Sequence, residues 1–295
     1  MIFSVWVVTT LTFVLMHSIP GGPFTKEKKL PPAVIKALNK KFHLDDPLLK
    51  QYTNYMKGVI TFDFGPSFKQ RGQTVNDFIS KGLPVSARIG FLSILVSLFF
   101  GIPIGLISAL KHSKWQDYAV LILATVGICI PNFVIATVFI YFFGLKLKLL
   151  PIYGLNSWDA YILPVIALSF YSLSFVARLV RSSMLEILEQ DYIRTARAKG
   201  LSEGVVILKH GLRNGIIPVV SYLGPLFTFI LCGSFIIEKI FSIPGLGKYY
   251  IESISNRDYT TIIGITVFDT ILLVTAVLVV DLIYGLIDPR IKIYK

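Results

Sequence analysis

Residues 191–218 read DYIRTARAKGLSEGVVILKHGLRNGIIP, a basic and glycine-punctuated stretch between two long apolar blocks. It holds five Lys or Arg residues and two acids, whereas the blocks near 161–180 and 216–237 carry only Arg178. Apolar segments of about 20 residues cross a bilayer as helices, and short basic loops remain on its cytoplasmic side. The stretch therefore predicts a cytoplasmic loop between two membrane helices, which we call the basic loop.

The rest of the chain repeats this apolar pattern. Of 295 residues 54% are hydrophobic and 16% charged, whereas soluble domains average about 25% charged residues. The apolar residues form continuous blocks rather than alternating strands, which favours helices. The first block is expected to be a retained helix, since no basic residue precedes it. The predicted fold class is all-α and polytopic, with six transmembrane helices near 1–19, 89–110, 117–144, 161–180, 216–237 and 262–287.

The net charge of +12 is distributed unevenly along the chain. If the N-terminus is cytoplasmic, five Lys or Arg residues fall in short outer loops and twelve in the long segment 20–88, where the positive-inside bias is weak. Both termini are therefore predicted to be cytoplasmic, and the charge signals orientation rather than nucleic-acid binding. Twelve basic residues then face inward: Lys111, Lys114, Arg178, Arg181, Arg194, Arg197, Lys199, Lys209, Arg213, Arg290, Lys292 and Lys295.

The N-terminal segment (20–88) is the one sizeable region outside the apolar blocks and is predicted to be extracytoplasmic. Short amphipathic helices are expected near 32–42 and 47–60, and DFGPSF at 63–68 is typical of a turn. The segment could pack on the membrane helices as a cap or dock an external partner, and the two roles are compatible. In its second helix four residues share one face: Tyr52, Tyr55, Met56 and Val59.

No enzyme motif is found in the sequence. It contains no HExxH, its four histidines are scattered, and Cys129 and Cys232 both lie inside apolar blocks. Gly247-Lys248 lacks the preceding glycine and the following Ser or Thr of a phosphate-binding loop. The chain is predicted to be no enzyme and to hold no metal or cofactor of its own. Any ATP chemistry must then come from another chain.

Three ionisable residues at membrane depth are singled out, because such a residue costs roughly 2.5–3.5 kcal/mol and marks function by default. They are Arg178, Asp269 and Asp281. Arg178 and Asp281 fall at similar depth near the cytoplasmic face, where they either pair or extend separately to the interface. All three are predicted to contribute to the transport path or its gating.

Glycines and prolines recur inside the blocks, where they permit kinks and close helix approach. They are Gly101, Pro103, Gly105, Pro131, Pro164, Gly224 and Pro225.

The basic loop itself predicts a helix–turn–helix. Tyr192, Ala196 and Gly200 fall on one helical stripe that ends in residues with almost no side chain. Gly200 is expected to end the first helix and Ser202 to cap the second. The stripe predicts a smooth surface that another backbone could approach closely. In the second helix three residues are expected to share a face: Val205, Leu208 and Leu212.

At this point the chain resembles a known family, the permeases of ABC importers. YIRTARAKG and HGLRNGIIP resemble their EAA loop, whose pattern is Glu-Ala-Ala-x-x-x-Gly followed by Ile-x-Leu-Pro. Arg194 and Thr195 replace Glu-Ala, and His210 and Arg213 stand at the Ile and Pro positions, as is typical of the oligopeptide/dipeptide branch. The resemblance, to the B-type permease subunit of an oligopeptide importer, extends to PGGPF (20–24), DFGPSF (63–68), FSIPGLG (241–247) and DLIYGLIDPRIK (281–292).

The resemblance implies a type I ABC importer permease. Its domains would be a first helix (1–19), an extracytoplasmic segment (20–88) and a five-helix core (89–295). Its partners would be a homologous permease, two cytoplasmic ATPases that bind ATP and magnesium, and an external peptide-binding protein in a bacterial membrane. The loop residues expected to couple to the ATPases are Tyr192, Arg194, Thr195, Ala196, Arg197, Gly200, Leu201, His210 and Arg213.

Two rival functions compete with a peptide importer. An importer of nickel or another small solute would use the same architecture, but no cluster of Met and His residues suggests a metal path. An ATP-independent secondary transporter would be indicated by inverted repeats and paired broken helices. Neither feature stands out in the sequence. A membrane scaffold that transports nothing is a further alternative, but it would leave the basic loop unexplained.

Overall fold

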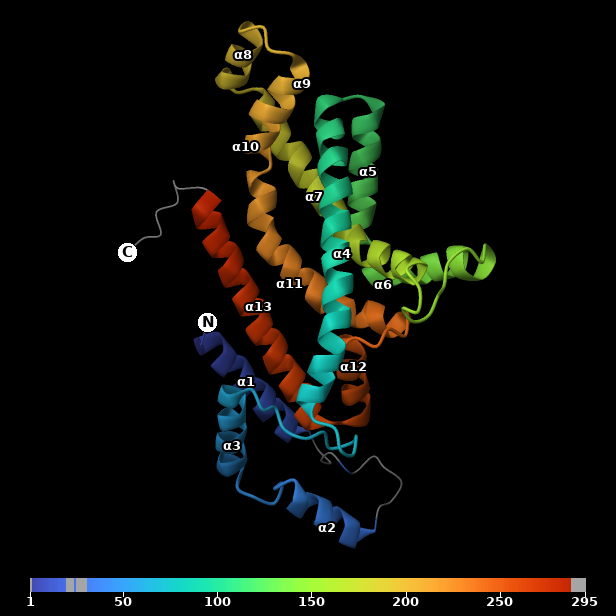
Figure 1. Ribbon diagram of the computed structural model, residues 1–295, viewed down its shortest axis with the longest axis vertical. Coiled ribbons are helices and arrows are strands. Elements are labelled where there is room, and N and C mark those ends of the chain that lie inside the picture. The colour runs from blue at the N-terminus through green and yellow to red at the C-terminus, as the bar shows by residue number, and fades with distance from the viewer. Residues whose placement is uncertain (1, 20–23, 25–30, 288–295) are drawn as a thin grey trace. The chain divides into compact units, whose positions relative to one another are not determined.

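The computed structural model describes residues 2–19, 24 and 31–287 (Figure 1). In this part of the chain the only β-type pairing is an isolated bridge between Pro66 and Thr74. The helices are α1 (Ile2–Ser18), α2 (Pro32–Lys41), α3 (Leu48–Thr61), α4 (Val75–Leu110), α5 (Trp115–Cys129), α6 (Asn132–Phe139), η1 (Ile140–Lys146), η2 (Asp159–Tyr161), α7 (Ile162–Leu188), α8 (Asp191–Ala198), α9 (Glu203–Val205), η3 (Val206–Leu212), α10 (Arg213–Gly215), α11 (Ile217–Ile240), α12 (Leu246–Asn256) and α13 (Tyr259–Ile287).

Among the described residues, three helices are long and apolar enough to cross a bilayer: Val75–Leu110, Asp159–Leu188 and Tyr259–Val280. A fourth span is obtained if α5 and the helical stretch Asn132–Lys146 count as one broken helix. Shorter apolar helices, Ile2–Ser18 and Ile217–Phe227, fall in the first and fifth predicted blocks. Every predicted block thus contains an apolar helix, and the all-α polytopic fold class is confirmed.

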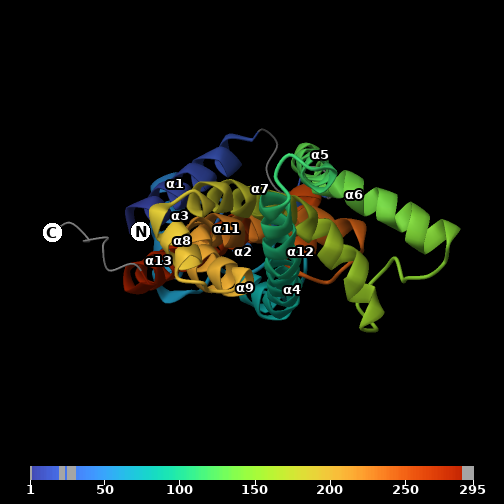
Figure 2. The ribbon, with the colours of Figure 1, turned by 90° about the horizontal axis from the view of Figure 1, so that it is seen from above.

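The third block departs from the continuous helix expected over 117–144. α5 ends at Cys129, α6 begins at Asn132, and the two directions differ by 103°. Figure 2 shows α5 nearly end-on with α6 extending sideways from it. Pro131 lacks an N–H and disfavours the helical conformation at Ile130, which is extended at φ −87° and ψ 123°. Pro131, one of the residues expected to permit a kink or close packing, thus breaks the helix here.

The chain forms two compact units, and their boundaries differ from the predicted domains. The first unit contains residues 1–86 and 242–275, and the second contains 87–241 and 276–295. The first boundary lies close to the predicted end of the N-terminal segment at residue 88. Residues 242–275, however, group with that segment rather than with the expected core over 89–295.

In the first unit the two short helices predicted for the N-terminal segment are confirmed as α2 and α3. The apolar stripe of α3 faces α1, where the Tyr52 hydroxyl is 2.7 Å from that of Thr10. The Phe13 ring centroid lies 5.4 Å from that of Tyr52 and 6.4 Å from that of Tyr55. Aromatic contact thus holds α1 and α3 together.

In the second unit α7 is the central helix: it carries twelve buried residues and contacts α5, α6 and α11. α4 packs directly on it through small residues. A Cβ atom at Gly105 would collide with the Ala177 carbonyl oxygen, and one at Gly101 would lie 3.0 Å from the Leu173 carbonyl oxygen. The predicted close approach at these two glycines is confirmed.

Candidate functional site

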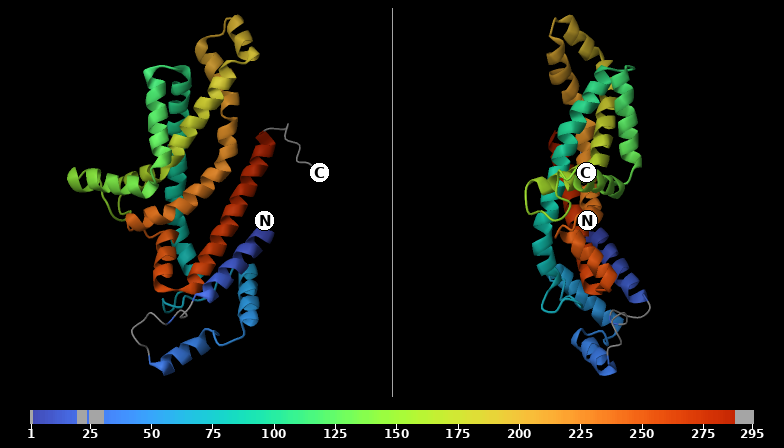
Figure 3. Two further views of the ribbon diagram at one scale, coloured as in Figure 1. Left: turned by 180° about the vertical axis from the view of Figure 1, so that it is seen from behind. Right: turned by 90° about the vertical axis from the view of Figure 1, so that its right-hand side faces the viewer.

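The basic loop folds as a short helical unit at the end of α7 (Figure 3, gold). Its first helix, α8, ends at Ala198, and Gly200 follows with φ +76°, a left-handed conformation that glycine adopts without strain. Ser202 occupies the N-cap position of α9, but its side chain makes no capping hydrogen bond. The predicted helix end at Gly200 is confirmed, and so is the position of the second helix start.

The interior of this unit is a small aliphatic cluster, which we call the loop core. Ile193 and Val206 are fully buried, Ala196 is 6% exposed, and Ile187 of α7 packs against them. Ala196 therefore faces inward. Gly200 lies beyond the end of α8, so the smooth stripe predicted to run from Tyr192 to Gly200 does not form as one surface.

The second half of the loop also differs from its predicted helical face. Residues 206–212 form a π-helix, η3, whose hydrogen bonds span five residues and shift the phase of the side chains. Val205 and Leu208 are 40% and 60% exposed, whereas Leu212 packs toward the buried cluster around α7. The expected shared face of these three residues is wrong.

Two glycines fasten the loop to α7. Met184 of α7 is fully buried, and its side chain lies against Gly211 and Gly215. A Cβ at Gly211 would lie 3.2 Å from the Met184 methyl carbon, and one at Gly215 would collide with the sulfur. The loop is therefore held tightly on the last turns of α7.

Polar contacts tie the two halves of the loop together. The Arg197 Nε donates to Glu203 Oε1 at 2.9 Å across the Gly200 turn. The Asn214 amide donates to the Tyr192 hydroxyl at 3.0 Å. The remaining predicted residues stay near the surface or bond locally: Thr195 donates to the Asp191 carbonyl, Arg194 lies 3.7 Å from the Asp191 carboxylate, Arg213 is exposed and His210 is half-buried.

The outer surface of the loop combines apolar and basic side chains around open backbone. Leu201 is 41% exposed, Leu208 is 60% exposed, and Lys209 is also exposed. A Cβ atom at Gly200 or at Gly204 would meet nothing within 4 Å. Gly204 is a candidate contact that the sequence pattern missed, because its openness depends on how η3 and α8 fold around it.

The predicted pathway residues lie on two different helices. Arg178 is exposed on α7, and Asp269 is half-buried on α13 in the other compact unit. The side chain of Asp281 lies outside the described part of the structure. The Arg178–Asp281 pair therefore stays a prediction.

A buried ion pair that the sequence pattern missed joins Asp117 to Arg181. The Asp117 side chain is 2% exposed and that of Arg181 is 16% exposed. Arg181 donates through Nη2 to Asp117 Oδ2 at 2.9 Å and through Nε to Oδ1. In the sequence analysis Arg181 served only as one of the basic residues that predict the membrane orientation. The available signal was that Asp117 is the sole acid in the block 117–144.

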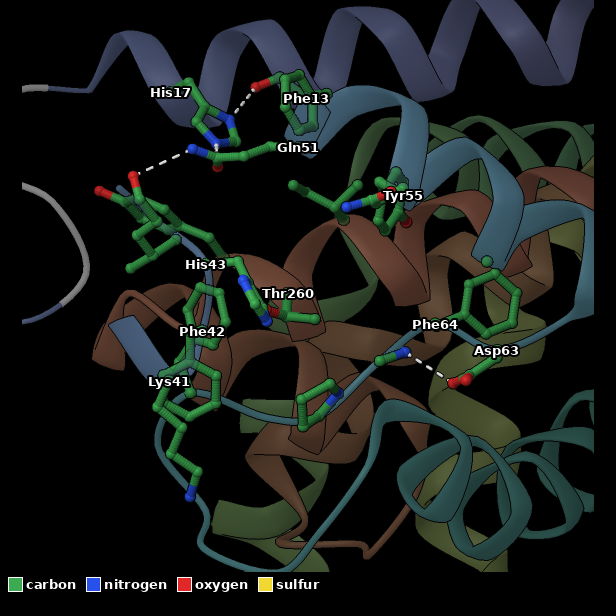
Figure 4. A pocket seen from close by; sticks show the side chains of 18 residues that line it. Phe13, His17, Lys41, Phe42, His43, Gln51, Tyr55, Asp63, Phe64 and Thr260 are labelled. Carbon is green, nitrogen blue, oxygen red and sulfur yellow. Dashed lines mark hydrogen bonds between the residues drawn. The ribbon is translucent and has the colours of Figure 1, made fainter. Parts of the chain in front are cut away.

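In the first unit an aromatic cavity of about 350 Å³ lies between α1, α3, the turn at 63–68 and the start of α13 (Figure 4). Burial raises the pKa of the Tyr55 phenol. His17 Nε2 lies 3.2 Å from Gln51 Oε1, and the Gln51 amide donates to the carbonyls of Leu44 and Asp46. Six Phe and Tyr residues contribute rings to the wall: Phe13, Phe42, Phe64, Phe68, Tyr55 and Tyr259.

Family comparison places this chain among known membrane components. Residues 101–293 match the family described as binding-protein-dependent transport system inner membrane component. Residues 1–89 match the N-terminal model of the same class of component. The chain therefore belongs to the binding-protein-dependent transport permeases, and it is a multi-pass membrane protein.

Individual relatives agree with the family. The chain is 51% identical over 292 residues to the dipeptide transport system permease DppB of Bacillus subtilis, covering 99% of this chain and 95% of the relative. It is 40% identical over 291 residues to the oligopeptide permease OppB of Salmonella typhimurium, covering 98% and 95%. Both alignments run nearly end to end.

Solved structures support the fold. An inward-facing MetNI methionine ABC transporter gives a TM-score of 0.62 at 17% identity, covering 72% of this chain and 96% of that one. An amino acid ABC transporter gives 0.52 at 20% identity, covering 70% and 92%. The chain thus has the type I ABC importer permease fold.

Proposed function

We propose that this chain is the transmembrane permease subunit of an ATP-driven importer of oligopeptides. It forms the transport path with a homologous second permease, and an external peptide-binding protein delivers the cargo. ATP and magnesium are bound and used by two cytoplasmic ATPases, while this chain supplies no catalytic residue. The names of its relatives, dipeptide and oligopeptide permeases, favour peptide over nickel or another small solute.

The folded basic loop is the observation that carries the proposal. It has its own buried core, it is fastened to α7 through Met184, and it presents apolar and basic side chains outward. A rigid loop with an apolar and positively charged surface fits a docking role, because its shape is fixed before the partner binds. We assign that partner as an ATPase subunit.

This assignment rests on a cytoplasmic position of the loop. The distribution of Lys and Arg favours both termini and the basic loop inside. Reporter fusions at Lys295 and within residues 145–160 are expected to report opposite sides of the membrane. The same side for both would contradict the orientation and with it the docking role.

The direct test is reconstitution. Co-expression with the proposed partner permease and ATPases is expected to yield a complex of two permeases and two ATPases. In proteoliposomes this complex is expected to take up a labelled tripeptide, trialanine. Uptake is expected to require ATP and the binding protein. A purified permease without bound ATPase, or uptake that proceeds without ATP, would contradict the proposal.

Gly204→Trp tests the docking surface with little internal disturbance. Gly204 is exposed, a Cβ added there would have no neighbour within 4 Å, and its φ lies outside the left-handed region. Added bulk in a tight interface costs roughly 1–3 kcal/mol, which lowers ATPase association by about one to two orders of magnitude. Gly200→Leu is a weaker test, because a side chain at φ +76° also strains the turn. Normal pull-down and uptake by Gly204→Trp would refute docking at this surface.

A further inference from the structure

The Asp117 carboxylate joins three segments of the second unit. Its Oδ1 accepts from the Ser108 hydroxyl of α4 at 2.6 Å, and its Oδ2 accepts from the Ser113 N–H in the α4–α5 turn at 3.0 Å. Arg181 of α7 completes the set with two parallel N–H donors. His112 Nδ1 lies 3.2 Å from the same Oδ2. One buried carboxylate thus links α4, α5 and α7.

This linkage ends a regular series of contacts between α4 and α7. The Ser93 hydroxyl donates to the Val165 carbonyl at 3.3 Å, and the Ser97 hydroxyl donates to the Ser169 carbonyl at 3.2 Å, each across 72 residues of sequence. Gly101 and Gly105 continue the series against the carbonyls of Leu173 and Ala177 at the same spacing. Because the spacing is constant, the two helices run parallel in fixed register, and the next residue of this row on α7 is Arg181.

The basic loop attaches to the same helix just beyond Arg181. Met184 holds Gly211 and Gly215, and Ile187 packs in the loop core. Positions 181, 184 and 187 are successive steps of three along α7. The ion pair therefore lies directly between the attachment of the loop and the contact between α4 and α7.

We propose that Asp117 and Arg181 form a positioning pair that makes α4 and α5 move together with the basic loop when the ATPases displace it. This role rests on the proposed function, since it requires a loop that ATPases move. The glycine contacts at this interface bring the backbones close together but supply no side-chain hydrogen bond of their own. A guanidinium that binds a carboxylate through two parallel hydrogen bonds fixes both distance and angle.

The test compares two substitutions at Arg181 in the complete reconstituted complex. Arg181→Lys keeps a charge beside Asp117 but removes the two-pronged geometry, and Arg181→Met removes both. Assembly, ATP hydrolysis and trialanine uptake are measured for each variant and expressed as ATP consumed per peptide imported. Lys50→Gln, which breaks the ion pair between Lys50 of α3 and Asp46 just before that helix, serves as the control.

Arg181→Lys is expected to assemble normally and to hydrolyse ATP, while ATP consumed per peptide rises at least about five-fold, the low end of typical coupling energies. Arg181→Met is expected to lose more uptake, and Lys50→Gln to match the unmodified complex. A normal ratio in assembled Arg181→Lys would overturn the proposal, as would failure of that variant to assemble, which would make the pair merely structural. If the unmodified complex shows no ATP-dependent uptake, the proposed function fails as well, and that failure is seen before any variant is made.

Discussion

The basic loop and the N-terminal segment both lie outside the apolar blocks, yet their interiors are built differently. The loop core consists of buried aliphatic side chains, Ile193, Ala196 and Val206. The N-terminal segment instead surrounds a cavity of about 350 Å³ with large aromatic rings. A filled aliphatic core keeps one shape under load, whereas a cavity lets neighbouring side chains adjust. The loop is therefore expected to be the less tolerant of the two.

Ala196→Trp is expected to have the largest effect. The indole cannot fit beside fully buried Ile193 and Val206, so the loop core opens. Overpacking costs roughly 1–3 kcal/mol and often more for so large a change. Trypsin cleavage at Arg194, Arg197 and Lys199 should accelerate while membrane insertion is unchanged, and ATPase pull-down should fail. If Ala196→Trp is cleaved by trypsin no faster than the unmodified protein and the ATPase pull-down is normal, Ala196 is not buried in the loop core.

A matched pair of aliphatic-to-aromatic changes sharpens the comparison. Ile193→Phe enlarges a fully buried side chain in the loop core and is expected to lower stability by about 1–3 kcal/mol. Leu44→Phe adds a ring beside the aromatic cavity and is expected to be neutral or to stabilise by up to about 1 kcal/mol. Thermal unfolding of the purified protein with local proteolysis measures both. Equal losses would erase the distinction between the two regions.

Tyr55→Phe probes the cavity wall itself. The Tyr55 hydroxyl is buried and has no hydrogen-bond partner among the described residues. Removing an unsatisfied buried hydroxyl relieves a desolvation penalty of roughly 1–3 kcal/mol, so the variant is expected to be at least as stable as the unmodified protein. A clear fall in the thermal midpoint would reveal a partner for the hydroxyl.

Arg197→Glu is expected to have the smallest effect. Arg197 pairs with Glu203, but both side chains are about half exposed. Such pairs contribute roughly 0.2–1 kcal/mol, so reversing the charge should leave the loop folded and reduce ATPase pull-down only slightly. The matched control is Arg194→Glu, whose ion pair with Asp191 is longer and more exposed. Complete loss of ATPase pull-down by Arg197→Glu, with normal pull-down by Arg194→Glu, would instead indicate that Arg197 contacts the ATPase directly.

The apolar blocks predicted the membrane helices well, because apolar composition and length are enough to identify a segment that can cross a bilayer. The kink at Pro131 and the tight packing at Gly105 also followed from residue type. The inward face of Ala196 did not, because a helix as short as α8 is oriented by Val206 and Ile187, which come from other elements. The Asp117–Arg181 pair was missed for the same reason, since 64 residues separate its members.

One measurement tests the central claim that the basic loop docks an ATPase. A photo-crosslinking amino acid is placed at Gly204 or Leu208 in the loop. The control position is Leu49 of α3, which is more exposed than Leu208, at 74% against 60%. Irradiation of the assembled complex is expected to join the ATPase to both loop positions and not to position 49. Adducts from position 49, or none from the loop, would contradict the account.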